Sequence, residues 1–195
     1  MLIDKAILAS DYIGTTDTAQ DEQLDRICAR AQSILDGWMH YRLGAQQYAD
    51  EKHDGCGDDY FYLISRPIIT VSSLTIDDES IDLDDIFLYE DQAKVDVNFP
   101  IPNGKQNIVI TYWAGYVGDV VPAEIVDLTT PALPKVIEEA MYMIAHRLWL
   151  NSGLSGQPRQ GLSSRSGDGG TTNFLQNLLP ADMISALEQY RRLRL

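Results

Sequence analysis

Residues 156–163, GQPRQGLS, come within one residue of the P-loop, the phosphate-binding pattern G-x-x-x-x-G-K-S/T. In a P-loop the backbone N–H groups surround the phosphates, the lysine reaches the terminal phosphates and the hydroxyl binds magnesium. Leu162 stands in the lysine position here, and the segment follows an expected helix instead of a strand. We therefore interpret it as a surface loop without a nucleotide-binding role.

The histidines and cysteines also have the chemistry of metal ligands and catalytic groups. His53 and Cys56 lie close together beside two aspartates, but a zinc site needs four ligands and the chain has no second Cys/His pair. His40 and His146 fall on two long expected helices, with no serine or cysteine nucleophile at a recognisable spacing. We expect no catalytic residue, no metal site and no cofactor.

Acidic residues gather between Asp77 and Asp96, with Lys94 as the one base among them. They are Asp77, Asp78, Glu79, Asp82, Asp84, Asp85, Glu90, Asp91 and Asp96. Paired carboxylates can do acid–base work or bind divalent cations, so an acidic metal-dependent hydrolase using them is one alternative function. The calcium-loop spacing D-x-D/N-x-D/N-G is absent, and the expected turn positions favour a solvated face of a sheet.

Composition narrows the class of protein further. The 195 residues include 15 basic and 29 acidic side chains, and the net charge of −14 argues against general binding of nucleic-acid phosphates. The two cysteines have no disulfide-framework spacing, which indicates a reducing compartment, and Cys28 is expected to be a buried free thiol. No apolar run reaches the length of a membrane span, so we expect a soluble, unexported chain.

Hydrophobic periodicity predicts an α+β fold, mainly an α-helical bundle with a small inserted antiparallel β-sheet and a flexible loop before the C-terminal helix. Apolar residues recur every three to four positions in two long segments, whereas short β-rich runs separated by turn residues lie between them. The expected single domain, 1–195, has helices at about 4–10 and 19–43, a β insert at about 59–114, a helix at about 134–151, a loop at about 153–173 and a helix at about 180–194.

The order and character of these segments resemble the head-tail connector (adaptor) proteins of tailed bacteriophages and prophages. The most specific pieces are Arg66-Pro67-Ile68 leading into a strand, and TYWAGY at 111–116 followed by Val121-Pro122. The resemblance covers about Leu24 to Gly153 and includes no catalytic signature. The chain departs from shorter family members by an insertion at Val126–Lys135, whose role the sequence does not indicate, and by its Gly/Ser-rich loop.

The resemblance implies a non-enzymatic virion protein of the neck, present in the host cytoplasm during assembly, that forms a ring of about twelve copies. Its implied partners are the portal protein above the ring and the next neck or tail-completion protein below it. Double-stranded DNA would pass through the ring without specific binding, and no membrane is involved. Another neck or tail-completion protein is the nearest alternative.

Two segments are candidate contact sites under this interpretation. The basic end YRRLRL contrasts with the acidic chain, and we expect the C-terminal helix to bind the portal, although positive charge there also simply complements the helix dipole. The candidate portal-binding residues are Leu187, Tyr190, Arg191, Arg192 and Arg194. The loop is expected to become ordered only in the assembly, and its candidate residues are Gly156, Gly161, Gly167, Gly169 and Gly170.

Overall fold

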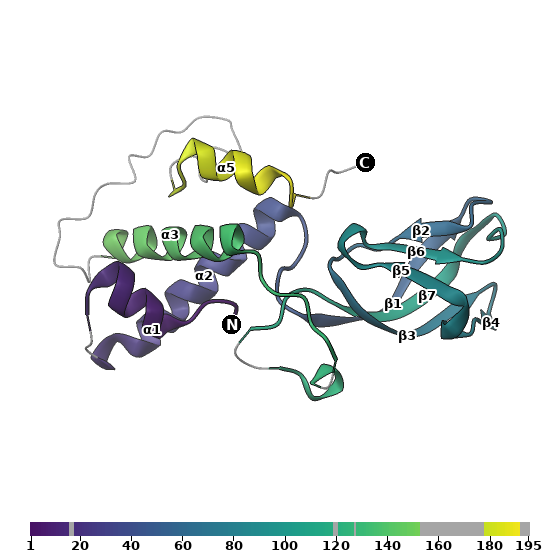
Figure 1. Cartoon of the computed structure of the whole chain (residues 1–195), viewed down its shortest axis with the longest axis horizontal. Helices are drawn as coiled ribbons and strands as arrows, with labels where there is room; N and C mark the ends of the chain where they lie inside the picture. The colour runs from purple at the N-terminus through teal and green to yellow at the C-terminus, as the bar shows by residue number, and fades with distance from the viewer. Residues whose placement is uncertain (16–17, 119–120, 127, 153–177, 192–195) are drawn as a thin grey trace. The chain divides into compact units, whose positions relative to one another are not determined.

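The computed structural model describes residues 1–15, 18–118, 121–126, 128–152 and 178–191 of the chain. These residues form two compact units, which Figure 1 shows as a helical part and a strand-rich part. The helical unit comprises Met1–His40 and Leu133–Leu195, and the sheet unit comprises Tyr41–Ala132. The expected α+β class is confirmed, but a mainly helical bundle is not, because the strands form a compact unit with a core of its own.

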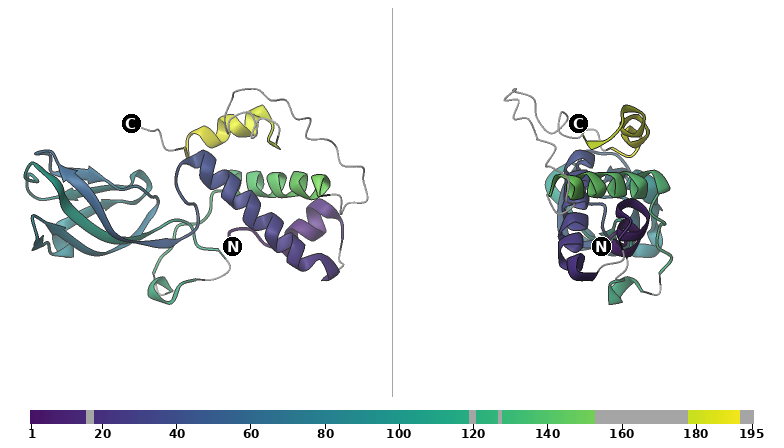
Figure 2. Two further views of the ribbon diagram at one scale, coloured as in Figure 1. Left: turned by 180° about the vertical axis from the view of Figure 1, so that it is seen from behind. Right: turned by 90° about the vertical axis from the view of Figure 1, so that its left-hand side faces the viewer.

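The helical unit is built around two long helices whose apolar stripes face each other. Helix α2 spans Asp21–Met39 and helix α3 spans Lys135–Asn151, and Figure 2 shows the two packed side by side. Their buried residues are Leu24, Cys28, Ala31, Leu35, Trp38 and Met39 from α2, and Ile137, Ala140, Met141, Tyr142, Ile144, Ala145, Leu148 and Trp149 from α3. Burying one large apolar side chain contributes roughly 1.5 to 3 kcal/mol, so these stripes are the main source of the unit's stability. Cys28 is a buried free thiol, as expected.

Shorter helices cover this pair. Helix α1 spans Lys5–Ile7, begins where the Asp4 side chain accepts a hydrogen bond from the N–H of Ala6, and continues as the π-helix η1 at Leu8–Ile13. Gly14, in the left-handed conformation, ends η1, and the 3₁₀ turn η2 at Thr18–Gln20 leads into α2. The C-terminal helix α5, Ala181–Glu188, packs on α3.

Helix α2 ends earlier than the range of about 19–43 expected for it. His40 adopts a left-handed conformation with φ of 65°, and its N–H donates to the carbonyl of Asp36. The chain leaves the helix at this residue, and Leu43 and Gly44 already belong to the sheet unit, where Gly44 forms a β-bridge with Tyr116.

The sheet unit contains two antiparallel sheets around one apolar core. The first has the strand order β1-β7-β3-β4, and the second has the order β2-β6-β5. The strands are β1 (Gln46–Gly55), β2 (Tyr60–Tyr62), β3 (Ile68–Ile76), β4 (Glu79–Ser80), β5 (Ile86–Tyr89), β6 (Lys94–Val97) and β7 (Gly104–Ala114). Short 3₁₀ turns lie at Leu83–Asp85, Glu90–Gln92 and Ala123–Ile125.

Alternation of apolar and polar residues sets which face of each strand is buried. Inward-facing residues from both sheets, among them Phe61, Leu74, Val95 and Ile110, form one hydrophobic cluster. Strand β1 lies before the β insert expected at about 59–114, so the sequence analysis did not predict it. This ten-residue strand pairs with the long strand β7, with two register shifts, along one edge of the first sheet, where polar side chains can remain exposed.

Candidate functional site

The C-terminal helix α5 is fixed to the helical unit by its apolar side. Leu187 is fully buried, and Leu178 and Leu179 just before the helix are buried as well. Pro180 occupies the N-cap position, where its missing N–H costs no hydrogen bond of the helix. Leu187, a candidate portal-binding residue, therefore contributes to packing within the unit in this conformation.

The first arginine of the basic end also contacts the helical unit. The guanidinium carbon of Arg191 lies 5.2 Å from the ring centre of Trp38, and Nη2 of Arg191 lies 3.1 Å from Nε2 of His40. Because a guanidinium can only donate hydrogen bonds, the His40 ring nitrogen is the acceptor in this contact. Arg191 thus fixes the turn after α5 onto the end of α2.

The other candidates differ in how much the structure says about them. Tyr190 is half-buried, and its N–H donates to the carbonyl of Leu187. Arg192 and Arg194 lie outside the described residues, as do the loop expected at 153–173 and all five of its candidate glycines. The P-loop-like segment 156–163 lies in the same stretch, so its predicted lack of a nucleotide role stays a prediction.

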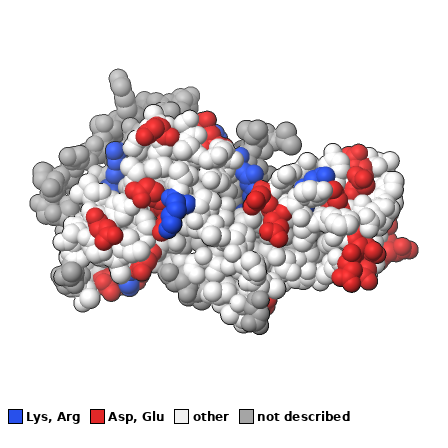
Figure 3. All heavy atoms as spheres, viewed as in Figure 1, with Lys and Arg blue, Asp and Glu red and all other residues white. Residues whose placement is uncertain are grey.

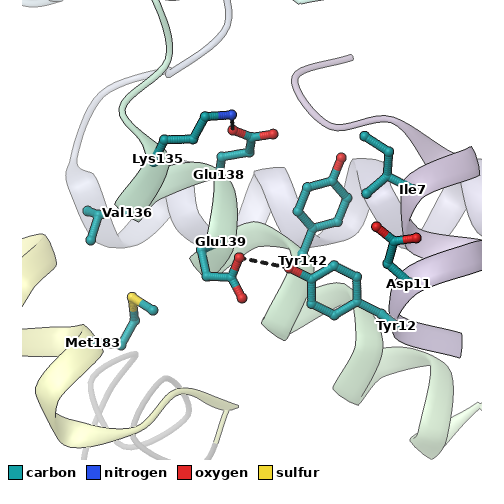
Figure 4. Close-up of a pocket in the computed structure, with 9 residues that line it drawn as sticks. All are labelled: Ile7, Asp11, Tyr12, Lys135, Val136, Glu138, Glu139, Tyr142 and Met183. Atoms are coloured by element: carbon teal, nitrogen blue, oxygen red, sulfur yellow. Dashed lines mark hydrogen bonds and ion pairs between the residues drawn. The ribbon is translucent and has the colours of Figure 1, made fainter.

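A hollow of about 580 Å³ lies within the helical unit between η1, the start of α3 and α5 (Figure 4). It is lined by Ile7, Asp11, Tyr12, Lys135, Val136, Glu138, Glu139, Tyr142 and Met183. The Tyr12 hydroxyl donates to Glu139 at 2.8 Å, and the Tyr12 and Tyr142 rings stack with centres 5.0 Å apart. Lys135 pairs with Glu138 at 2.6 Å. The Asp11 carboxylate accepts a hydrogen bond from the Ser10 hydroxyl at 2.5 Å, so all three carboxylates of the hollow already have a partner.

The tyrosines of this hollow are poor acid–base catalysts. Burial, together with the hydrogen bond and the negative charge of Glu139, raises the pKa of Tyr12 well above its usual value. Burial likewise raises the pKa of Tyr142, whose hydroxyl accepts a hydrogen bond from the N–H of Asp4 at 3.1 Å. Both phenols remain protonated near neutral pH, so they act as hydrogen-bonding and packing groups that join η1 to α3.

A polar cluster in the sheet unit has the residue types of a catalytic site. The Glu51 carboxylate accepts hydrogen bonds from three groups, His53 Nε2 at 2.7 Å, the Tyr112 hydroxyl at 2.8 Å and the N–H of Ile64 at 2.9 Å. The Ser65 N–H donates to the same Tyr112 hydroxyl at 3.3 Å. Sequence reasoning missed this cluster because its members come from β1, β7 and the segment after β2, and Glu51 lies outside the β insert expected at about 59–114.

Burial indicates that the Glu51 cluster stabilises the sheet unit instead of binding a substrate. Ser65 and Tyr112 are fully buried, and the Glu51 side chain is 7% exposed. Burial alone would raise the pKa of Glu51, but hydrogen bonds from His53, Ile64 and Tyr112 outweigh it and lower the pKa. The carboxylate is therefore charged at neutral pH and is held by donors from three segments of the unit.

Negative charge is concentrated in the sheet unit. Tyr41–Ala132 holds 17 acidic and 5 basic residues, a formal charge of −12, whereas the helical unit holds 12 acidic and 10 basic residues, a charge of −2. Eight of the nine acidic residues between Asp77 and Asp96 are exposed. In Figure 3 acidic side chains gather at the end of the unit where β4 lies.

The acidic residues are not arranged as a metal centre. Among the described residues, no three His, Cys, Asp or Glu side chains converge closely enough to hold a metal ion. A metal-dependent hydrolase needs converging carboxylates, and the described residues contain no such group. No described helix is both long and apolar enough to cross a membrane.

Comparisons with known proteins give a consistent family and fold. The model of the head completion protein family matches residues 9–149. Three solved structures share the fold: "Neck of empty GTA particle computed with C6 symmetry" (TM-score 0.61, 16% identity), "Virion of native gene transfer agent (GTA) particle" (0.58, 16%) and "Neck of native GTA particle computed with C12 symmetry" (0.53, 13%). The matches cover 99 to 100% of this chain and 91 to 94% of those chains. Among curated proteins, none matches this chain in sequence.

Proposed function

Because the chain belongs to the head completion protein family, we propose that it is a non-enzymatic connector of the virion neck that forms a ring beneath the portal, extends the DNA channel and docks the next neck or tail component. The family match over residues 9–149 is the observation that carries the proposal, since it spans both structural units. The fold similarity to chains from neck structures with C6 and C12 symmetry supports a ring.

The charge distribution supports passage of DNA without specific binding. A protein that binds the phosphate backbone presents clustered lysines and arginines, each replacing condensed counterions. The sheet unit instead carries a formal charge of −12, and its acidic side chains are largely exposed. Such a surface repels the DNA backbone and would offer little adhesion to a moving duplex.

The portal contact is proposed to lie at the basic C-terminal end. Because Leu187 is buried and Arg191 contacts Trp38 and His40, α5 and Arg191 position this end, and Arg192 and Arg194 are the remaining charged candidates for the partner. Arginine pairs with carboxylates through two parallel hydrogen bonds, which suits an acidic patch on the portal. Tyr190, next to Arg191, would add a ring to the same contact.

Light scattering and a portal binding assay test the proposal together. The parent chain should form a ring, alone or with portal, and Arg192→Glu with Arg194→Glu should weaken portal binding in a salt-sensitive way. The double variant Lys52→Glu and Lys105→Glu makes the same change in charge at exposed positions of the sheet unit and is the control. A chain that stays monomeric with portal present would refute the connector role, and equal binding by both double variants would refute the anchor.

A further inference from the structure

The outer face of the three-stranded sheet is aromatic. Antiparallel register places Tyr62 and Tyr89 beside Lys94, and places Tyr60 and Phe87 beside Asp96. Three of these rings are largely exposed, Tyr62 at 50%, Phe87 at 59% and Tyr89 at 45%. We call Tyr60, Tyr62, Phe87 and Tyr89 the aromatic face. Contiguous exposed aromatic groups on a folded protein mark an interaction surface.

The aromatic face is already arranged around a cation. The Lys94 ammonium lies 4.4 Å from the ring centre of Tyr60 and 4.9 Å from that of Tyr89, and it pairs with Asp96 at 2.7 Å. Tyr60 and Tyr62 meet edge to face with ring centres 5.6 Å apart. The rings are held in place by their strands and by Lys94, so a partner would find them in a fixed arrangement.

Exposed carboxylates follow or precede each aromatic strand. Asp58 and Asp59 come before β2, whereas Glu90 and Asp91 come directly after Tyr89 of β5. Aromatic rings bordered by carboxylates favour a partner that presents arginine, because a guanidinium stacks on rings and pairs with carboxylates at the same time. The acidic border repels DNA phosphates and disfavours pairing with a second sheet unit of charge −12.

The helical unit of a second copy offers the required chemistry. Its 10 basic residues nearly balance its 12 acidic ones, so its formal charge is only −2, and helix α2 exposes Arg26 and Arg30 one turn apart. Arg26 pairs with Glu22 of its own helix, and its side chain remains 74% exposed. A contact between two different surfaces of identical chains can be heterologous, and repetition of such a contact generates a ring when the rotation from copy to copy closes.

We propose that the aromatic face of one copy binds the arginine-bearing surface of α2 on a neighbouring copy, and that this contact builds the ring. The inference rests on the proposed connector function and adds the surfaces that join the subunits. Sheet-to-sheet pairing is disfavoured by charge, so the contact is directional. It would also be weakened by salt, because part of it is electrostatic at an exposed surface.

Light scattering of the full chain over a concentration series tests the contact. The variant Tyr62→Thr with Phe87→Thr removes two exposed rings while keeping β-forming residues, and it should raise the dissociation constant between copies at least about tenfold. Val126→Thr removes apolar surface at another exposed position, 58% exposed, and should leave assembly unchanged. Circular dichroism and thermal melting establish that each variant is folded.

An exchange of charges identifies the partner surface. Arg26→Glu with Arg30→Glu should weaken assembly, and Glu90→Arg with Asp91→Arg should weaken it as well. A chain carrying all four substitutions should assemble again, because the attraction is restored with opposite signs. If the folded Tyr62→Thr, Phe87→Thr variant assembles like the parent, or if the chain with all four charge substitutions does not recover assembly, this contact is refuted. Ring formation by the parent would still support the connector function. A parent that never assembles, even with portal, would overturn both.

Discussion

Glu51→Gln should destabilise the sheet unit strongly, although the change removes only one charge. The carboxylate lies beneath the surface and accepts hydrogen bonds from His53, Tyr112 and the N–H of Ile64. Tyr112 lies 61 residues from Glu51 in the sequence, so the carboxylate links strands that are distant along the chain. Glutamine has nearly the same volume, but it keeps one acceptor oxygen and turns an NH₂ group toward groups that also donate.

The expected loss of folding free energy follows from the number of hydrogen bonds that the Glu51 carboxylate accepts. A hydrogen bond to a charged partner contributes roughly 1.5 to 3 kcal/mol, and a neutral one contributes about 1 kcal/mol. Three bonds to the charged carboxylate contribute at least about 4.5 kcal/mol and one or two neutral ones recover about 1 to 2 kcal/mol, so the substitution should lower the free energy of unfolding by at least about 2.5 kcal/mol. For a domain of roughly 60 to 100 residues, each kcal/mol lowers the melting temperature by about 4 to 8 °C.

The effect should depend on pH in a definite direction. Because the pKa of Glu51 is lowered in the folded chain, its charge stabilises the fold above the unfolded value of about 4.3, and the stabilisation is lost as pH falls through the lower folded value. The difference in free energy of unfolding between the parent and Glu51→Gln should have its full value at pH 7. It should shrink below about pH 4, where the carboxyl group of the parent takes up its proton.

Hydrogen–deuterium exchange of β7, read by mass spectrometry beside thermal melting, isolates the sheet unit from the helical one. Glu79→Gln changes the same residue type at an exposed position of β4 and should shift stability by less than about 0.5 kcal/mol. If Glu51→Gln melts like Glu79→Gln at pH 7, or if its deficit persists unchanged at pH 3, the Glu51 carboxylate does not tie the strands together.

Further substitutions test the packing and the backbone. Trp149→Ala should cost about 3 to 5 kcal/mol, since the ring is 5% exposed, and a melting temperature within a degree or two of the parent would contradict its burial in the core. Gly115→Ala should destabilise the sheet unit, because φ is +115° and a Cβ would lie 2.7 Å from the Gly44 carbonyl oxygen. Gly37→Ala, in open space on α2, should instead stabilise by roughly 0.5 to 1 kcal/mol in urea titrations, and the opposite order would refute the backbone analysis. Arg191→Ala should lower the free energy that holds α5 on the helical unit by about 0.5 to 1 kcal/mol, which would be measured as faster amide exchange in α5.

The helical elements were predictable because each carries a long periodic signal. In α2 and α3 most residues of the apolar stripes are buried, although Ile27, Ile34 and Val136 are only half-buried, and the acidic residues in the first turn of α2 mark its beginning. The end of α2 was less predictable, because His40 takes the left-handed conformation that glycine usually supplies. The sequence pattern alone placed the end of this helix at about residue 43, whereas α2 ends at Met39.

Strand β1 shows what the sequence could not reveal. Its residues QQYADEKHDG have the composition of a polar loop, because an edge strand needs few apolar side chains. Two bulges also interrupt its pairing with β7. Tyr48 is its main apolar contribution, stacked on Tyr112 with ring centres 5.0 Å apart. The buried role of Glu51 depends on that missed strand, so no reading of local pattern would have found it.

The candidate contact residues show a related limit. A basic C-terminal end was visible in the sequence, but the contact of Arg191 with Trp38 and His40 joins residues about 150 positions apart and needed the fold. The aromatic face could not be predicted from the sequence for the same reason, because Tyr62, Phe87 and Tyr89 come together only through the register of three strands.

The segregation of charge between the two units has a consequence that does not depend on how the units are arranged in the subunit. Two copies that meet through their sheet units bring together surfaces of charge −12 each, and like charges at an interface cost several kcal/mol. Two copies that meet through sheet unit and helical unit avoid most of that repulsion, because the helical unit carries only −2. Contact between the two different units of identical chains can be repeated from copy to copy around a closed ring. The same distribution that makes DNA adhesion unfavourable thus favours contact between the sheet unit of one copy and the helical unit of another over contact between two sheet units, and the charge-exchange variants test that preference.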